Sequence, residues 1–172
     1  MRRVLAALAA IGGVAALLAG SPVPIDVHAL ARAVAREEDH VTAIELATWL
    51  HDRKPGLRII DLRTPEEFDA YHLPRAENES IESLTSMPFA HGETIVLVSA
   101  GGAHAAQGWV LLRTLGLRDV YFLRGGVQEW IDDVTNAGTP LARYFGGPVE
   151  VPASAGTGRL KPASTPPRRQ GC

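Results

Sequence analysis

The sequence predicts an α/β fold, a layered domain with a mostly parallel central sheet. Short apolar runs alternate with segments of helical periodicity, and glycine or proline separates many of them. Of the 172 residues, 46% are hydrophobic and 21% are charged, which is the composition of a globular domain. Strands that alternate with helices run in one direction, because each helix carries the chain back across the sheet. The length fits one domain of ordinary size.

The predicted elements follow one another along the chain without an internal repeat. Val27, Leu30 and Val34 lie at helical spacing and predict a short amphipathic helix. Thr42, with Glu45 three residues later, is a capping box that opens the second helix. The full series is a helix within 26–39, a helix over 43–51, a strand over 57–62, a helix over 65–71, a strand over 93–98, a helix over 105–115, a strand over 120–123 and a helix over 127–134.

Local signals set the bounds of the later elements. Pro55 and Gly56 precede the first strand, and an uncharged β-branched run makes up most of the second. Thr64 and Pro65 supply the N-cap and the first position of the helix after the first strand. Gly116 ends the helix that follows the second strand.

The two ends of the chain do not follow the α/β pattern. Residues 1–21 combine a basic start with seventeen uncharged residues, Val4 to Gly20, and predict a signal peptide or an N-terminal membrane anchor. Residues 22–39 are a linker with a short helix, and residues 40–145 form the domain. Residues 146–172 are rich in proline and basic residues and predict a flexible tail. We therefore expect an exported protein, either periplasmic or otherwise extracytoplasmic, or one anchored in the membrane by its N-terminal segment.

Charge and cysteine content exclude several classes of protein. The chain has 17 basic and 19 acidic residues, a formal net charge of −2. All the acidic residues lie within residues 21–150, so the domain has no basic excess with which to bind nucleic acid. Cys172 is the only cysteine, which excludes an internal disulfide framework. We expect no metal, no cofactor and no nucleic acid, and a membrane contact through residues 4–20.

The candidate site is the loop that follows the strand over 93–98. Ligands of parallel sheets bind beyond the carboxyl ends of the strands. A glycine-containing loop that runs directly into a helix turns backbone N–H groups toward an anion. The candidate ligand-binding residues are Ser99, Ala100, Gly101, Gly102, Ala103 and His104, with Asp61 and Arg63 in support. We expect His104 to add donor capacity to this loop, and Arg63 to pair with Glu67.

Several motifs occur in the order and spacing of a known family. They are Asp61-Leu62-Arg63 followed by Glu67, then His72-Leu73-Pro74-Arg75-Ala76, and Leu123-Arg124-Gly125-Gly126. Together with the strand, loop and helix at 94–116, they resemble the rhodanese-like domain family over residues 40–134. The resemblance implies a three-layer fold and a sulfurtransferase-type loop of six residues. It also implies a cysteine at the first loop position, which carries a persulfide and passes sulfur to an acceptor.

The chain departs from the family pattern in the loop itself. Ser99 occupies the nucleophile position, and His104 stands where an arginine is common. Tyr71 and Arg75 replace glycines of the histidine motif. A thiolate attacks sulfur because it is soft and partly ionised near neutral pH, whereas a serine hydroxyl is neither. We therefore expect an exported rhodanese-like pseudoenzyme that binds a small anion, a sulfur compound or a protein partner at residues 99–104.

Three alternatives stay open at this point. Cys172 could return on the tail as the persulfide thiol of a thiosulfate-type sulfurtransferase or sulfur carrier, with Arg168 and Arg169 favouring its thiolate. The domain could instead be a structural or assembly scaffold, since fold does not fix function. Ser99 could act as a hydrolase nucleophile with His104, although no third residue is found to orient that histidine. Whether the protein is an enzyme stays open, and sulfur transfer is the reaction to expect if it is.

Overall fold

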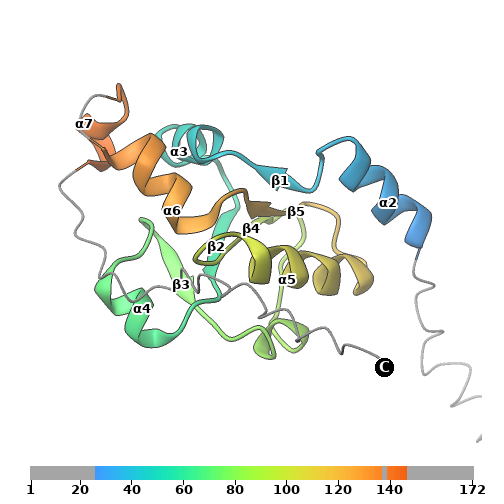
Figure 1. The fold of residues 1–172 in the computed structure, drawn as a ribbon. Coiled ribbons are helices and arrows are strands. Elements are labelled where there is room, and N and C mark those ends of the chain that lie inside the picture. The colour runs from blue at the N-terminus through green and yellow to red at the C-terminus, as the bar shows by residue number, and fades with distance from the viewer. Residues whose placement is uncertain (1–25, 137–138, 147–172) are drawn as a thin grey trace, which may run out of the picture.

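The computed structural model describes residues 26–136 and 139–146. The elements run in the order α2 (Val27–Ala35), β1 (His40–Val41), α3 (Ala43–His51), β2 (Leu57–Asp61), α4 (Pro65–Ala70), β3 (Ala76–Asn78), η1 (Ser83–Thr85), β4 (Thr94–Val98), α5 (Ala103–Thr114), β5 (Val120–Leu123), α6 (Gly126–Trp130), η2 (Ile131–Thr135) and α7 (Ala142–Phe145) (Figure 1). The predicted signal peptide or anchor at 1–21, all but the first residue of the tail at 146–172, and Cys172 lie outside the described residues.

Five strands form one sheet in the order β1-β5-β4-β2-β3, and each neighbouring pair is parallel. Ile59 of β2 lies opposite Val96 of β4, and Leu97 of β4 lies opposite Phe122 of β5. The prediction of an α/β fold with a mostly parallel sheet is confirmed. The sequence does not predict the edge strands β1 and β3, because two and three residues are too few to show a strand period.

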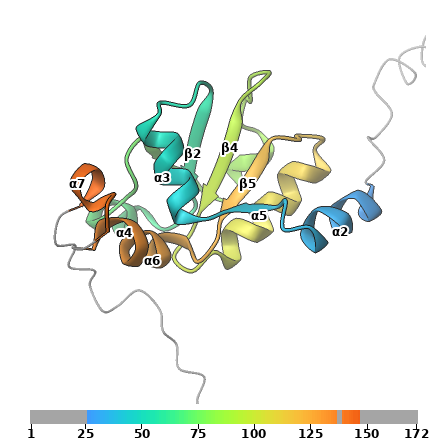
Figure 2. The same ribbon diagram turned by 90° about the horizontal axis from the view of Figure 1, so that it is seen from above.

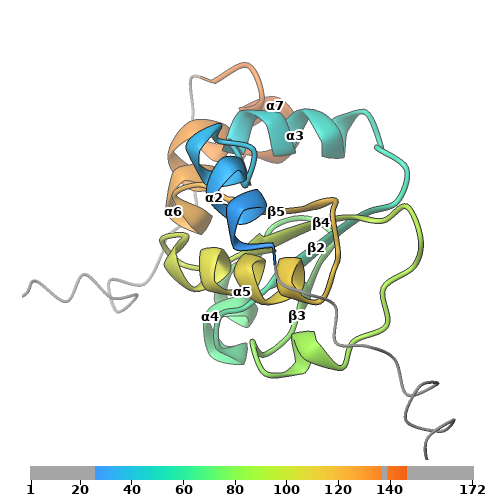
Figure 3. The ribbon, with the colours of Figure 1, turned by 90° about the vertical axis from the view of Figure 1, so that its right-hand side faces the viewer.

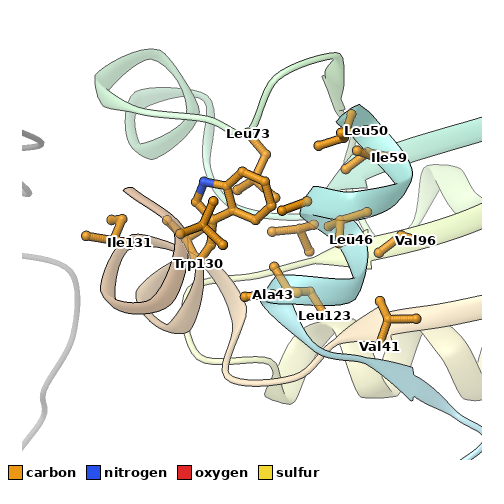
Figure 4. Close-up of a cluster of buried hydrophobic side chains, with 14 of the residues drawn as sticks. Val41, Ala43, Leu46, Leu50, Ile59, Leu73, Val96, Leu123, Trp130 and Ile131 are labelled. Atoms are coloured by element: carbon orange, nitrogen blue, oxygen red, sulfur yellow. The ribbon is translucent and has the colours of Figure 1, made fainter. Parts of the chain in front are cut away.

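Helices cover both faces of the sheet and give three layers (Figures 2 and 3). One face packs against α3 and α6 through a buried cluster that contains Trp130, Leu46 and Ile59 (Figure 4). The other face packs against α5 through a second cluster that contains Trp109 and Leu112. Because both faces are covered, β4 is buried along all but its first residue, as parallel strands generally are.

The predicted capping box at Thr42 and the predicted N-cap at Thr64 are both present. The Thr42 hydroxyl accepts the N–H of Glu45 at 3.2 Å, and the Glu45 carboxylate accepts the N–H of Thr42 at 2.9 Å. The hydrogen bonds that the Thr42 N–H and hydroxyl donate to the Glu45 carboxylate lower the pKa of Glu45 from its ordinary value. Thr64 and Glu67 form the same reciprocal pair ahead of α4. The bounds of α3 match the prediction, and α5 begins at Ala103, two residues earlier than predicted.

The predicted apolar face of α2 is wrong in part. Leu30 does pack against the cluster beneath α5, but Val27 and Val34 are 64% and 53% exposed. Ala33 is buried in their place. Helical spacing identifies residues that share a face, but the side on which the neighbouring layer lies decides which face is covered. Among residues 26–136 and 139–146, no helix is long and apolar enough to cross a membrane.

Candidate functional site

Three chain segments meet at the carboxyl end of the sheet. The loop that contains Ser99 joins β4 to α5, the glycine pair Gly125-Gly126 joins β5 to α6, and Asp61 ends β2. The strands β2, β4 and β5 are adjacent in the sheet, so their ends lie side by side. This is the edge at which parallel α/β sheets bind ligands.

Ser99 is buried within its own loop. Its side chain turns back, so that Oγ accepts the N–H of Gly102 at 3.1 Å and the N–H of Ala105 at 3.3 Å. The residue is only 3% exposed. A small polar atom is therefore held at the centre of the loop by two backbone donors.

The start of the loop rests on the first turn of α6. The carbonyl of Ser99 accepts the N–H of Val127 at 3.0 Å, and the carbonyl of Ala100 accepts the N–H of Gln128 at 3.3 Å. Gly126 has φ +62°, and a Cβ on it would lie 2.1 Å from the Ser99 carbonyl oxygen. Only glycine permits this approach, because any side chain would push the loop away.

Four backbone N–H groups in and beside the loop remain without an acceptor in the described part of the chain. Within the described part of the chain, no acceptor is found for the N–H groups of Ala100, Gly101, Ala103 and His104. Gly102 caps α5 with φ +89° and no side-chain hydrogen bond. Free N–H groups at the start of a twelve-residue helix, aided by its dipole, favour a bound anion.

Asp61 and Arg63 form a buried ion pair. Arg63 Nη2 lies 2.6 Å from Asp61 Oδ2, and the two side chains are 8% and 0% exposed. The guanidinium also donates to the carbonyl of Tyr71 at 2.6 Å and to that of Glu67 at 3.3 Å. The predicted ion pair between Arg63 and Glu67 is wrong, because the Glu67 carboxylate accepts the N–H of Thr64 instead. Asp61 and Arg63 therefore brace the chain between β2 and α4, and their charges satisfy each other.

His104 lies on the exposed side of α5. With Gln107 it lines a cavity of about 610 Å³, whose opposite wall includes Thr64 and Glu79. The cavity lies between the first turns of α5 and the segments that follow β2 and β3, and His104 is the residue of the range 99–104 that lines it. The imidazole can contact a ligand that extends from the loop into this cavity.

Tyr71 and Arg75 stand where the histidine motif has glycines, and the structure shows what each does there. The Tyr71 hydroxyl accepts the Trp130 Nε1 hydrogen at 2.9 Å, across 59 residues of chain. Burial raises the pKa of Tyr71 from its ordinary value. Arg75 has φ +65°, the left-handed region that a glycine occupies without strain.

Sequence reasoning misses the residues that hold the loop from the α6 side. Val127 and Gln128 do so through backbone groups, and their side chains carry no signal for this role. The paired glycines before them are the one available sign, since adjacent glycines often mark a close backbone approach. Within the described ranges, no group of three or more His, Cys, Asp or Glu could hold a metal ion.

Comparison with known proteins gives a consistent family. A family model described as the rhodanese-like domain matches residues 42–133. The tRNA uridine(34) hydroxylase of Rickettsia typhi is 26% identical over 91 residues, which cover 48% of this chain and 37% of that protein. The protein of the same name from Deinococcus radiodurans is 29% identical over 91 residues, which cover 48% of this chain and 30% of that protein. The chain thus spans about a third of the length of these relatives, 37% of one and 30% of the other.

Solved structures agree on the fold. The Alr3790 protein of Anabaena superposes with a TM-score of 0.50 at 25% identity, covering 54% of this chain and 76% of that one. A protein of Rhodopseudomonas palustris, described as of unknown function and a possible tyrosine phosphatase, gives 0.51 at 21% identity, covering 66% and 96%. The family match extends from the capping box of α3 into η2, across all three segments that meet at the loop. The chain belongs to the rhodanese-like domain family.

Proposed function

We propose that this protein is an exported or membrane-anchored rhodanese-like module that binds a small anion or sulfur compound at residues 99–104 and lacks conventional sulfur transfer. The observation that carries the proposal is the position of Ser99. The residue is 3% exposed, and its Oγ is held by two backbone donors at the first position of the loop, where the family pattern has cysteine.

The Ser99 hydroxyl cannot carry a persulfide in place of the cysteine thiol. Sulfur transfer requires a thiolate that attacks the outer sulfur of a donor, and a polarisable sulfur that then holds the persulfide. A serine hydroxyl has a far higher pKa than a thiol and is a poor nucleophile toward sulfur. The hydrogen bonds to Gly102 and Ala105 hold the Ser99 oxygen as an acceptor, and His104 lies on the exposed side of the helix. Hydrolysis by a Ser99–His104 pair is therefore not part of the proposal.

The rest of the loop retains what an anion needs. The N–H groups of residues 100, 101, 103 and 104 have no acceptor within the described part of the chain, and they stand at the N-terminus of α5. Backbone donors and the helix dipole favour an oxyanion without a charged side chain. The chemical class that fits is a small oxyanion such as sulfate, sulfite or thiosulfate, and His104 would contact any larger body attached to it.

The names of the relatives do not extend the proposal to RNA. The matched segment is 37% of the Rickettsia typhi protein, so most of that hydroxylase has no counterpart in the match. The net charge of −2 also gives no general attraction to a phosphate backbone. We therefore propose a binding role for the shared domain only.

The proposal is tested by restoring the thiol. The variants are Ser99→Cys and Ser99→Ala, both in a Cys172→Ser background, each exposed to thiosulfate and measured by intact-protein mass spectrometry. We expect the Ser99→Cys protein to gain one sulfur atom that cyanide removes, because the loop keeps its free backbone donors around the restored thiol. We expect the Ser99→Ala protein and the wild type to gain none.

Two results would overturn this proposal. Sulfur added to the wild type but not to Cys172→Ser would make the tail thiol a sulfur carrier, the main alternative function. No rise of the thermal unfolding midpoint with thiosulfate or sulfate, against sodium chloride at the same ionic strength, would leave a scaffold without a ligand. The expected result is a rise that saturates at low oxyanion concentration, since a ligand that binds only the folded state stabilises it. Exclusion of sulfate from the protein surface would instead raise the midpoint without saturation.

A further inference from the structure

The helix α2 carries an apolar stripe that the domain does not cover. Leu30 and Ala33 pack toward the layer of α5. Val27, Ala31 and Val34, here called the α2 stripe, are exposed at i, i+4 and i+7, and therefore lie on one side of the helix. The two valines are 64% and 53% exposed, so the stripe is accessible along the length of the helix.

Basic side chains border the α2 stripe. His28, Arg32 and Arg36 follow one another at intervals of four residues and are all exposed. Arg32 lies 3.8 Å from Asp26, and Arg36 lies 3.8 Å from Glu38. Because carboxylates balance the two arginines, any attraction of this helix to a surface rests mainly on the apolar stripe. An apolar stripe beside long cationic side chains is the arrangement of helices that lie in a membrane interface.

The chain before α2 determines what this stripe can reach. The uncharged run at residues 4–20 is long enough to be held in a bilayer, and only residues 21–26 separate it from α2. Six residues span at most about 20 Å when fully extended. A bilayer that holds the run therefore lies within reach of α2. Tethering raises the effective concentration of a weakly apolar face at that surface.

The position of α2 in the domain fits such an arrangement. In Figures 1 and 2, α2 lies beyond the C-terminal end of α5, whereas the loop at 99–102 precedes the N-terminal end of α5. A twelve-residue helix is about 18 Å long. The α2 stripe and the anion-binding loop are thus at opposite ends of that helix.

We propose that the α2 stripe lies on the surface of the lipid bilayer that residues 4–20 enter, so that the domain is held with its Ser99 loop directed away from the membrane. This inference rests on the anchored form of the proposed function and adds an orientation to it. The valines enter the headgroup boundary, and the basic border faces the phosphates. Since the net charge of the helix is small, the contact forms on zwitterionic lipid as well as on anionic lipid.

The test uses the full chain in phosphatidylcholine vesicles. In a Cys172→Ser background, one variant carries Val34→Cys and a matched control carries Ile44→Cys, each labelled with the same environment-sensitive fluorophore. Ile44 is 45% exposed on α3, in the layer on the other side of the sheet. Some of the lipid carries a nitroxide on the upper acyl chain, which quenches a fluorophore that enters the headgroup boundary.

We expect quenching and a blue shift for the label at Val34, and neither for the label at Ile44. Adding Val27→Glu should abolish the quenching at Val34 while the chain still sediments with the vesicles, because a carboxylate is costly to place in the interface. Equal signals from Val34 and Ile44 on vesicle-bound protein would overturn the orientation but leave the anchor intact. A chain absent from the vesicle fraction would overturn both, and would leave anion binding at the loop unaffected.

Discussion

Two neighbouring segments at the carboxyl end of the sheet have opposite characters. After β2, the charges of Asp61 and Arg63 are buried and satisfy each other, and the guanidinium closes the chain onto the carbonyl of Tyr71. After β4, the loop headed by Ser99 satisfies two of its donors internally and leaves four N–H groups of the described chain without an acceptor. The segment after β2 thus carries full charges that are already paired, whereas the loop after β4 has uncharged donors that remain available to a ligand.

Charge is therefore a poor guide to the binding site in this protein. An ion pair with side chains 8% and 0% exposed has no capacity left for a ligand, and its role is to fix the chain. Uncharged backbone donors at a helix start retain that capacity, since the helix geometry leaves its first N–H groups unpaired.

The largest effect is expected from Arg63→Met. The change leaves the Asp61 carboxylate buried without its partner, which should lower the free energy of unfolding by about 3–5 kcal/mol in urea titration. The control is Arg32→Met, whose ion pair with Asp26 is exposed and should contribute little. Similar losses in the two variants would show that the segment after β2 is not the closed brace described here.

A smaller but still large effect is expected from Gly126→Ala. Its Cβ would lie 2.1 Å from the Ser99 carbonyl oxygen, and φ is +62°, so we expect a loss of about 2–4 kcal/mol. Affinity for thiosulfate should fall as well, because the loop would move off α6. Gly92→Ala separates the two causes: φ is +82° but nothing lies within 4 Å of the new Cβ, so it should show the smaller conformational cost alone. Equal losses in both variants would argue against close packing of the loop.

Removal of the Ser99 hydroxyl should increase the number of unpaired backbone donors in the loop after β4. Ser99→Ala leaves the N–H groups of Gly102 and Ala105 without their acceptor, at a cost of about 1–3 kcal/mol. Those donors then become available to a ligand, so added sulfate should raise the unfolding midpoint more in this variant than in the wild type. An equal response to sulfate in both proteins would mean that the anion does not approach these donors.

The smallest effect, with the opposite sign, is expected from Arg75→Gly. Arg75 has φ +65°, and glycine relieves a cost of about 1 kcal/mol there, so the free energy of unfolding should rise. The matched control is Arg118→Gly, an exposed arginine that is not among the residues of positive φ and should lose stability instead. A loss at both positions would show that the Arg75 side chain contributes more than its backbone strain costs.

Much of the fold could be predicted because its signals are local. Thr42 and Thr64 open α3 and α4 through hydrogen bonds to residues three positions away, and these are written directly in the sequence. The strand at Thr94–Val98 is a continuous apolar run because both of its faces are covered. The start of the candidate loop lies directly after β4 as predicted, although Ala103 and His104 belong to the first turn of α5.

Other features could not be predicted, because they depend on contacts between segments that are distant in the sequence. The partner of Arg63 is Asp61 rather than Glu67, because the capping hydrogen bond from Thr64 already engages the Glu67 carboxylate. The exposed valines of α2 share their helical period with buried residues, and only the position of the α5 layer separates the two sets. In the sequence, Ser99 is simply one polar residue of a loop. Only the structure shows that Gly126 allows α6 to pack against the Ser99 carbonyl. Sequence determines the groups and their local geometry, whereas the packing of distant segments determines which groups are satisfied and which remain free to bind.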